Sequence, residues 1–363
     1  MTNRASFKGP RMNFKDPNEP LEPKGNKPIR EASSVLEVLV LMIVHLCKKI
    51  LFFDTNLKIA LYLGTLFLLS LVADVLTFPK IYFSRSDNLF NQYFVKIGWF
   101  WTLFLTVPYV LLTSYTTCCG NQRIILTKHL PRILIATVAW YTWTTVFNII
   151  ESKYGRCNAR NYDTKILCLK NGHFWNGFDI SGHCFILIYS SLILIEEARA
   201  INGWERIKDY IRDEQFSRSV GDKAPSTNPL KNISQAELAI LKKSYDAYTP
   251  YVRLLLIAIT ALQILWDVML VSTIMYYHIM VEKFVSGVIA ILTWFVTYRV
   301  WYTIPHLLPD LPGDAVFKYN KAKPAPPTAP IKKRLSTTNG KHFMGMPINN
   351  RSQEAEVTNE DSR

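Results

Sequence analysis

Residues 133–150 read ILIATVAWYTWTTVFNII, a run of consecutive positions without a single charged side chain. A helix rises about 1.5 Å per residue, so a run of this length crosses most of the roughly 30 Å apolar core of a bilayer. The whole chain has the same character, because 49% of its 363 residues are hydrophobic and only 19% are charged. A soluble globular enzyme would intersperse its charges along the chain. The run therefore predicts a membrane-spanning helix.

Similar runs lie on both sides of this one. Together the predicted spans are Ile59 to Phe78, Ile97 to Ser114, Ile133 to Ile150, Ile180 to Ile195, Leu254 to Tyr277 and Phe284 to Tyr302. The run from Ile180 to Ile195 is the shortest of the six. We expect an all-α polytopic membrane protein whose six transmembrane helices form a membrane domain over 59–303, with a polar loop over 197–250.

The segment ahead of the first span has a different pattern. Val35 to Phe53 is apolar but interrupted by charged residues and a histidine that gather toward one helix face, which predicts an amphipathic interfacial helix over 35–53 on the membrane surface. Residues 1–34 are polar, basic and rich in proline, with no apolar core of a signal peptide. We expect disordered tails over 1–34 and 304–363.

The basic residues orient the spans. With the N-terminus in the cytosol, 31 Lys and Arg residues fall on the cytosolic side and 9 on the other, which places both termini in the cytosol. The net charge of +14 thus gathers in tails and loops beside a membrane, and it does not indicate a nucleic-acid partner.

Two histidines reach the same membrane face in this topology. His183 opens the fourth span and His278 closes the fifth, and one full cytosolic loop separates them. A lone histidine at a membrane interface is more often a tolerated polar residue, but two at equal depth favour a functional site. A pair of this kind suits phosphoryl transfer, in which one imidazole attacks phosphorus and the other protonates the leaving oxygen.

The neighbours of the two histidines fit this chemistry. Ser181 and Gly182 precede His183, and a glycine at a helix N-terminus lets a phosphate approach the backbone amides. Asp179 lies four residues before His183, and Glu282 lies four residues after His278, so each carboxylate is placed to orient one ring. For both carboxylates, a solvated charge at a helix end is an equally favoured interpretation.

Several motifs resemble the fat storage-inducing transmembrane (FIT) family of endoplasmic-reticulum proteins. The resemblance covers about residues 59–303. The matching motifs are Asn91-Gln92-Tyr93-Phe94-Val95-Lys96, Phe174-Trp175-Asn176-Gly177-Phe178-Asp179-Ile180-Ser181-Gly182-His183, Glu196-Glu197, Tyr277-His278, and Thr293-Trp294-Phe295-Val296-Thr297-Tyr298.

The family looks like a relative of the lipid phosphate phosphatases. The resemblance implies a lumen-facing site that cleaves the phosphoanhydride of fatty acyl-CoA and supports lipid-droplet formation. It makes His278 the nucleophile and His183 the histidine of the Ser-Gly-His motif. Two positions depart from the phosphatase pattern, since Ser272 stands where an arginine is expected and Glu282 where an aspartate is expected. Lys96 is then a possible phosphate-binding cation in place of that arginine.

Two functions compete at this point. The first is an acyl-CoA diphosphatase, and the alternative is a non-catalytic protein that binds neutral lipids, triacylglycerol and diacylglycerol, and partitions them into droplets. No metal-ligand spacing and no glycine-rich phosphate loop occurs, so neither a metal nor another cofactor is expected. Asp267, inside the fifth span, is too far along the helix to reach a phosphate at His278 and is expected to be a packing or lipid-binding group.

Two cysteines share the predicted lumenal loop. Cys157 and Cys168 are the only ones between the third and fourth spans, and the lumen is an oxidising compartment. We expect them to form a disulfide.

Overall fold

The computed structural model describes residues 34–320, apart from 77, 80, 86, 160–163, 221–227 and 305–306, and the short stretches 342–343 and 346–347. The chain divides into two compact units, residues 1–321 and 322–363. The second contains one antiparallel pair, β3 (His342–Phe343) with β4 (Met346–Pro347). Most of both expected disordered tails, 1–33, 321–341 and 348–363, lies outside the described residues.

The first unit is helical. In chain order it contains α1 (Val35–Leu51), α2 (Thr55–Gly64), the π-helix η1 (Thr65–Leu69), α3 (Ser70–Val75), the 3-10 helix η2 (Tyr82–Ser84), the π-helix η3 (Asn91–Val95), α4 (Gly98–Thr117), α5 (Gln122–Ile124), the π-helix η4 (Ile125–His129), α6 (Leu130–Tyr154), α7 (Lys165–Lys170), α8 (Gly182–Ala198), the 3-10 helix η5 (Arg199–Ile201), α9 (Arg206–Val220), α10 (Gln235–Tyr276), α11 (Met280–Trp294), the π-helix η6 (Phe295–Val300) and the 3-10 helix η7 (Trp301–Thr303). A two-residue antiparallel pair joins β1 (Arg156–Cys157) to β2 (Trp175–Asn176).

All six predicted spans coincide with helices. Four continuous helical stretches among the described residues are long and apolar enough to cross a membrane, namely Thr55–Val75, Gln122–Tyr154, Gln235–Tyr276 and Met280–Thr303. These helices indicate a multi-pass membrane protein. The other two predicted spans correspond to α4 and to α8, and a count of six spans stays a prediction.

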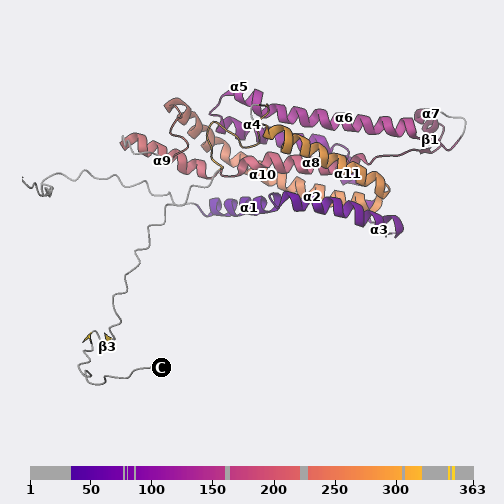
Figure 1. Cartoon of the computed structure of the whole chain (residues 1–363), viewed down its shortest axis with the longest axis horizontal. Helices are drawn as coiled ribbons and strands as arrows, with labels where there is room; N and C mark the ends of the chain where they lie inside the picture. The colour runs from indigo at the N-terminus through magenta and orange to yellow at the C-terminus, as the bar shows by residue number, and fades with distance from the viewer. Residues whose placement is uncertain are drawn as a thin grey trace, which may run out of the picture. The chain divides into compact units, whose positions relative to one another are not determined.

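The shortest predicted span forms the centre of the bundle. Every residue of α8 from Cys184 to Ala198 is buried, and the helix packs against α4, α6, α10 and α11. Figure 1 shows α8 among these helices, with α3, α7 and β1 at one end of the bundle and α5 and α9 at the other. We call the first of these the histidine end, because His183 and His278 lie there.

Side-chain caps set where the helices begin. Ser34, Asp54 and Ser181 accept backbone N–H groups at the starts of α1, α2 and α8. Ser234 and Glu237 form a reciprocal capping box at the start of α10. Because helix ends leave backbone donors without partners, these polar residues account for the observed boundaries.

The structure corrects two predicted boundaries. The polar segment 197–250 is largely helical where it is described, since α9 fills its first part and α10 begins at Gln235, well before the predicted span. The C-terminal tail was expected to be disordered from 304, but Phe317 and Tyr319 are buried and the Tyr319 hydroxyl donates to the Ala200 carbonyl at 2.9 Å. Aromatic side chains anchor this stretch to the bundle. The composition of the tail as a whole is polar and therefore did not reveal these anchors.

The N-terminal segment is a helix, as its pattern indicated. Val44, Cys47 and Leu51 of α1 are buried, and the helix packs against α10. Its opposite face exposes large apolar side chains, among them Leu39, Met42 and Leu46. Its position on the membrane surface stays a prediction.

Candidate active site

The turn between α10 and α11 holds His278. Its backbone has φ +55°, in the left-handed region that few non-glycine residues adopt. Tyr277 before it is extended, so the chain reverses direction within a few residues and α11 starts at Met280. Asp74, at the end of α3, accepts the Met280 backbone N–H at 2.8 Å and so secures the turn from a neighbouring helix. Residues in strained backbone conformations cluster at functional sites.

Glu282 orients the His278 ring. One carboxylate oxygen, Oε2, lies 3.3 Å from His278 Nδ1, and the other, Oε1, accepts the Asp179 backbone N–H at 3.1 Å. A carboxylate accepts hydrogen bonds, so this contact assigns the ring proton to Nδ1. The lone pair of Nε2 is then left for another partner.

Asp179 lies beside His278, whereas its spacing in the sequence suggested either a contact with His183 or a solvated charge. Its Oδ2 is 3.7 Å from His278 Nδ1. The spacing of four residues orients a side chain only within a helix, and α8 begins at Gly182, after Asp179. Partial burial raises the pKa of the Asp179 carboxyl, and the nearby His278 ring acts in the opposite direction. Two carboxylates therefore face one imidazole.

His183 lies in the first turn of α8. The Ser181 side chain accepts the Cys184 N–H at 3.3 Å, and the Ser181 carbonyl accepts the Ser286 hydroxyl of α11 at 2.6 Å. Gly182 is exposed, and apart from its chain neighbours and the backbone of its own helix no atom lies within 4 Å of where a Cβ would be. The start of α8 is thus fixed by hydrogen bonds yet open to an approaching anion.

The two histidines belong to one group of residues. The His183 ring lies 6.4 Å, between centroids, from the ring of Tyr277, the residue before His278. His183 is also within electrostatic range of both His278 and Lys96. The fold therefore brings the two imidazoles to the same end of the bundle, as the sequence predicted.

The two lysines near the site, Lys96 and Lys283, differ in exposure and in contacts. Lys96 is exposed directly after η3. Lys283 follows Glu282 but is only 1% exposed, and its ammonium donates to the Ile274 carbonyl at 2.7 Å and lies 3.9 Å from Asp74. Lys283 is therefore committed to the packing of α10 against α11, whereas the Lys96 side chain faces solvent. Within the described part of the chain, no group of three or more His, Cys, Asp and Glu side chains could hold a metal ion.

A disulfide constrains the segment that precedes Asp179. Cys157 and Cys168 are joined, with their Cα atoms 5.8 Å apart. Beside them β1 pairs with β2, and the Trp175 indole donates to the Glu151 carbonyl of α6 at 3.0 Å. The segment between α6 and Asp179 is therefore held by the disulfide, by the strand pair and by the hydrogen bond of Trp175.

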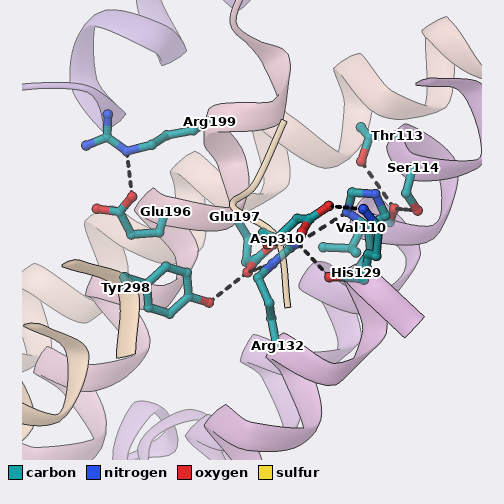
Figure 2. Close-up of polar contacts among 11 residues, drawn as sticks. Val110, Thr113, Ser114, His129, Arg132, Glu196, Glu197, Arg199, Tyr298 and Asp310 are labelled. Carbon is teal, nitrogen blue, oxygen red and sulfur yellow. Dashed lines mark hydrogen bonds and ion pairs between the residues drawn. The ribbon is translucent and has the colours of Figure 1, made fainter. Parts of the chain in front are cut away.

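A second polar cluster lies at the other end of the bundle, and the motifs noted in the sequence include only Glu197 and Tyr298 of its members. Arg132 forms a two-pronged ion pair with Glu197, both contacts being 2.9 Å, with 2% and 1% of the two side chains exposed. Figure 2 shows the Tyr298 hydroxyl and the Asp310 backbone converging on the same pair. The cluster joins α6, α8 and η6 to the C-terminal segment, so its evident role is to hold these elements together.

The chain is similar to proteins of one known family. The family model for the fat storage-inducing transmembrane protein (FIT) matches residues 79–298. The chain is 51% identical to acyl-coenzyme A diphosphatase FITM2 of Drosophila melanogaster, over 92% of this chain and 79% of that one. It is 32% identical to the protein of the same name in Danio rerio, over 69% and 88%, and 28% identical to that of Homo sapiens, over 64% and 78%. No solved structure matches.

The family match covers both histidines, the two carboxylates and Lys96, and the similarity to the insect relative extends over almost the whole chain. On these grounds this chain belongs to the fat storage-inducing transmembrane (FIT) family.

Proposed function

We propose that this protein is an acyl-CoA diphosphatase, a hydrolase of the phosphoanhydride of fatty acyl-CoA. The relatives named above carry this activity in their names. The observation that carries the proposal is the contact of His278 Nδ1 with Glu282, because it leaves Nε2 as a nucleophile at the end of the bundle where His183 lies.

The reaction needs one nucleophile and one acid. His278 Nε2 attacks a phosphorus of the phosphoanhydride, and the bond from that phosphorus to the bridging oxygen breaks. His183, in its protonated form, donates a proton to the departing phosphate. Water then displaces the phosphoryl group from His278, so that one acyl-CoA and one water yield acyl 4'-phosphopantetheine and adenosine 3',5'-bisphosphate. Lys96 is placed to offset charge on the substrate, while Asp179 and Glu282 stabilise a positively charged His278 ring.

The orientation belongs to the same proposal. The histidine end faces the lumen of the endoplasmic reticulum, and both termini face the cytosol. The excess of basic residues in the predicted cytosolic segments supports this orientation. So does the disulfide between Cys157 and Cys168, because such bonds persist in oxidising compartments.

Binding of triacylglycerol or diacylglycerol without catalysis is the alternative. It leaves unexplained why a carboxylate orients an imidazole beside a second histidine. The enzymatic function therefore accounts for more of the site.

The test uses the purified full-length protein with oleoyl-CoA, and mass spectrometry of the products. We expect acyl 4'-phosphopantetheine and adenosine 3',5'-bisphosphate in equal amounts. His278→Ala and His183→Ala should each abolish the reaction, because a general acid contributes roughly 10² to 10⁴-fold and loss of a nucleophile costs more. Wild-type rates in both folded variants would exclude this function.

A further inference from the structure

A polar cavity of about 950 Å³ lies beside the His278 turn. Its lining includes Asp74 of α3, Tyr82 and Ser84 of η2, and Tyr276 at the end of α10. Two contacts connect it to the turn. Asp74 accepts the Met280 N–H, and the Tyr277 hydroxyl donates at 3.4 Å to the carbonyl of Phe83, within η2. One wall of the cavity is therefore built from the segment that positions His278.

The described lining of this cavity carries both signs of charge. It has one cation, Arg85, and two carboxylates, Asp74 and Asp87. A neutral chain with amide and hydroxyl groups would find donors and acceptors in Ser84 and Tyr82. Of the parts of an acyl-CoA, the pantetheine arm has this chemistry.

An apolar groove of about 450 Å³ lies on the same side of α10 as α2. Asp267, Leu270, Val271 and Ile274 form one stripe of α10 along it, spaced by three or four residues, and Leu61 of α2 faces them. Ile274, the lining residue nearest the histidine end, lies two residues before the end of α10 and four residues before His278. The groove thus leads toward the active site.

A polar cluster lies at Asp267, the lining residue of α10 farthest from the histidine end. The Asp267 carboxylate accepts hydrogen bonds from Lys58 at 3.1 Å, Tyr62 at 2.6 Å and Gln263 at 3.1 Å. With three donors, one of which is the Lys58 ammonium of its ion pair, the carboxylate needs no ligand, so the cluster is suited to end a groove and not to bind a charged group within it.

We propose that the acyl chain of the substrate lies in this groove between α2 and α10, while the pantetheine arm crosses the polar cavity and brings the phosphoanhydride to His278. This inference rests on the proposed acyl-CoA diphosphatase function. The arm has on the order of twelve backbone bonds between phosphate and sulfur, a reach of roughly 15 Å when extended, so it needs a cavity between the reacting phosphorus and the acyl chain. The groove then selects for chain length, with the Asp267 cluster as its end wall.

The test compares chain-length preference in two tryptophan variants of the full-length protein in nanodiscs. Val271→Trp fills the groove, whereas Val268→Trp adds the same side chain to a position of α10 outside the groove lining; the two valines are 46% and 45% exposed. We expect Val271→Trp to lower the ratio of kcat/KM for oleoyl-CoA to that for hexanoyl-CoA about tenfold, the effect of losing roughly two buried methylene groups. Val268→Trp should keep the ratio within about twofold of the wild type. An unchanged ratio in Val271→Trp, or an equal fall in Val268→Trp, would overturn the inference.

A binding measurement separates this inference from the proposed function. An acyl-CoA with a photoreactive diazirine in its acyl chain should label peptides from 55–75 or 267–274, and excess oleoyl-CoA should prevent the labelling. Labelling only elsewhere in the bundle would contradict the groove even if the enzyme is active. If the wild type hydrolyses no acyl-CoA, the proposed function fails, and the position of the label alone decides whether the groove binds the acyl chain.

Discussion

Glu282→Gln is the change that tests the geometry of the site most directly. The carboxylate makes two contacts as an acceptor, to His278 Nδ1 at 3.3 Å and to the Asp179 backbone N–H at 3.1 Å. A glutamine side chain has only one acceptor oxygen, and its other terminal atom donates. It cannot satisfy both partners, although its size and shape are almost those of glutamate.

Either arrangement of the glutamine impairs the site. If its oxygen keeps the Asp179 N–H, its NH₂ group faces Nδ1, which must then accept, and the ring proton moves to Nε2, where it blocks the attack. Loss of a carboxylate that holds a catalytic histidine in the right tautomer has cost about 10⁴-fold in a serine protease. If its oxygen turns to His278, the Asp179 N–H faces a donor, a cost of about 1–3 kcal/mol.

We therefore expect kcat for oleoyl-CoA to fall by about 10² to 10⁴-fold in Glu282→Gln, with a much smaller change in KM, because the contacts act on the nucleophile. The control is Glu205→Gln, which removes a carboxylate that pairs with Arg253 at 2.6 Å, outside the site. It should retain most of the activity. Thermal unfolding of each purified protein checks that both are folded. A folded Glu282→Gln protein with kcat within about threefold of the wild type would refute the assignment of Nε2 as the nucleophile.

Three further changes test the surrounding structure. Cys157→Ser should lower the melting temperature of non-reduced protein, since closing so short a loop with Cys168 stabilises by roughly 3 kcal/mol in the chain-entropy model; an equal melting temperature would contradict a stabilising bond. Arg132→Leu should destabilise by about 3–5 kcal/mol, because it leaves a buried carboxylate unpaired, and limited proteolysis should then cut the C-terminal segment earlier than in the wild type. His173→Thr creates a glycosylation sequon at Asn171 in the proposed lumenal loop, and a glycosidase-sensitive increase in mass is expected; its absence in membrane-inserted protein would argue for the opposite orientation.

Local patterns in the sequence predicted the long apolar helices, and they predicted that His183 and His278 lie at one end of the bundle. Apolar runs long enough for a bilayer coincide with helices at all six predicted spans, because backbone groups in an apolar environment must be hydrogen-bonded within the segment. The order of spans and loops brought His183 and His278 to one end, and the short loop between Cys157 and Cys168 indicated their pairing. These results depend on periodicity, chain connectivity and redox chemistry, all of which can be read along the chain.

The tertiary structure decided which side chains meet. Asp179 turned to His278, since it lies before the helix in which a spacing of four residues would have directed it to His183. The left-handed backbone of His278 and the double contact of Glu282 depend on how α3, α8 and α11 pack around the turn. The pairing of Arg132 with Glu197 joins residues far apart in the chain. Such contacts follow from packing between helices, and the pattern within one helix does not specify the position of its neighbours.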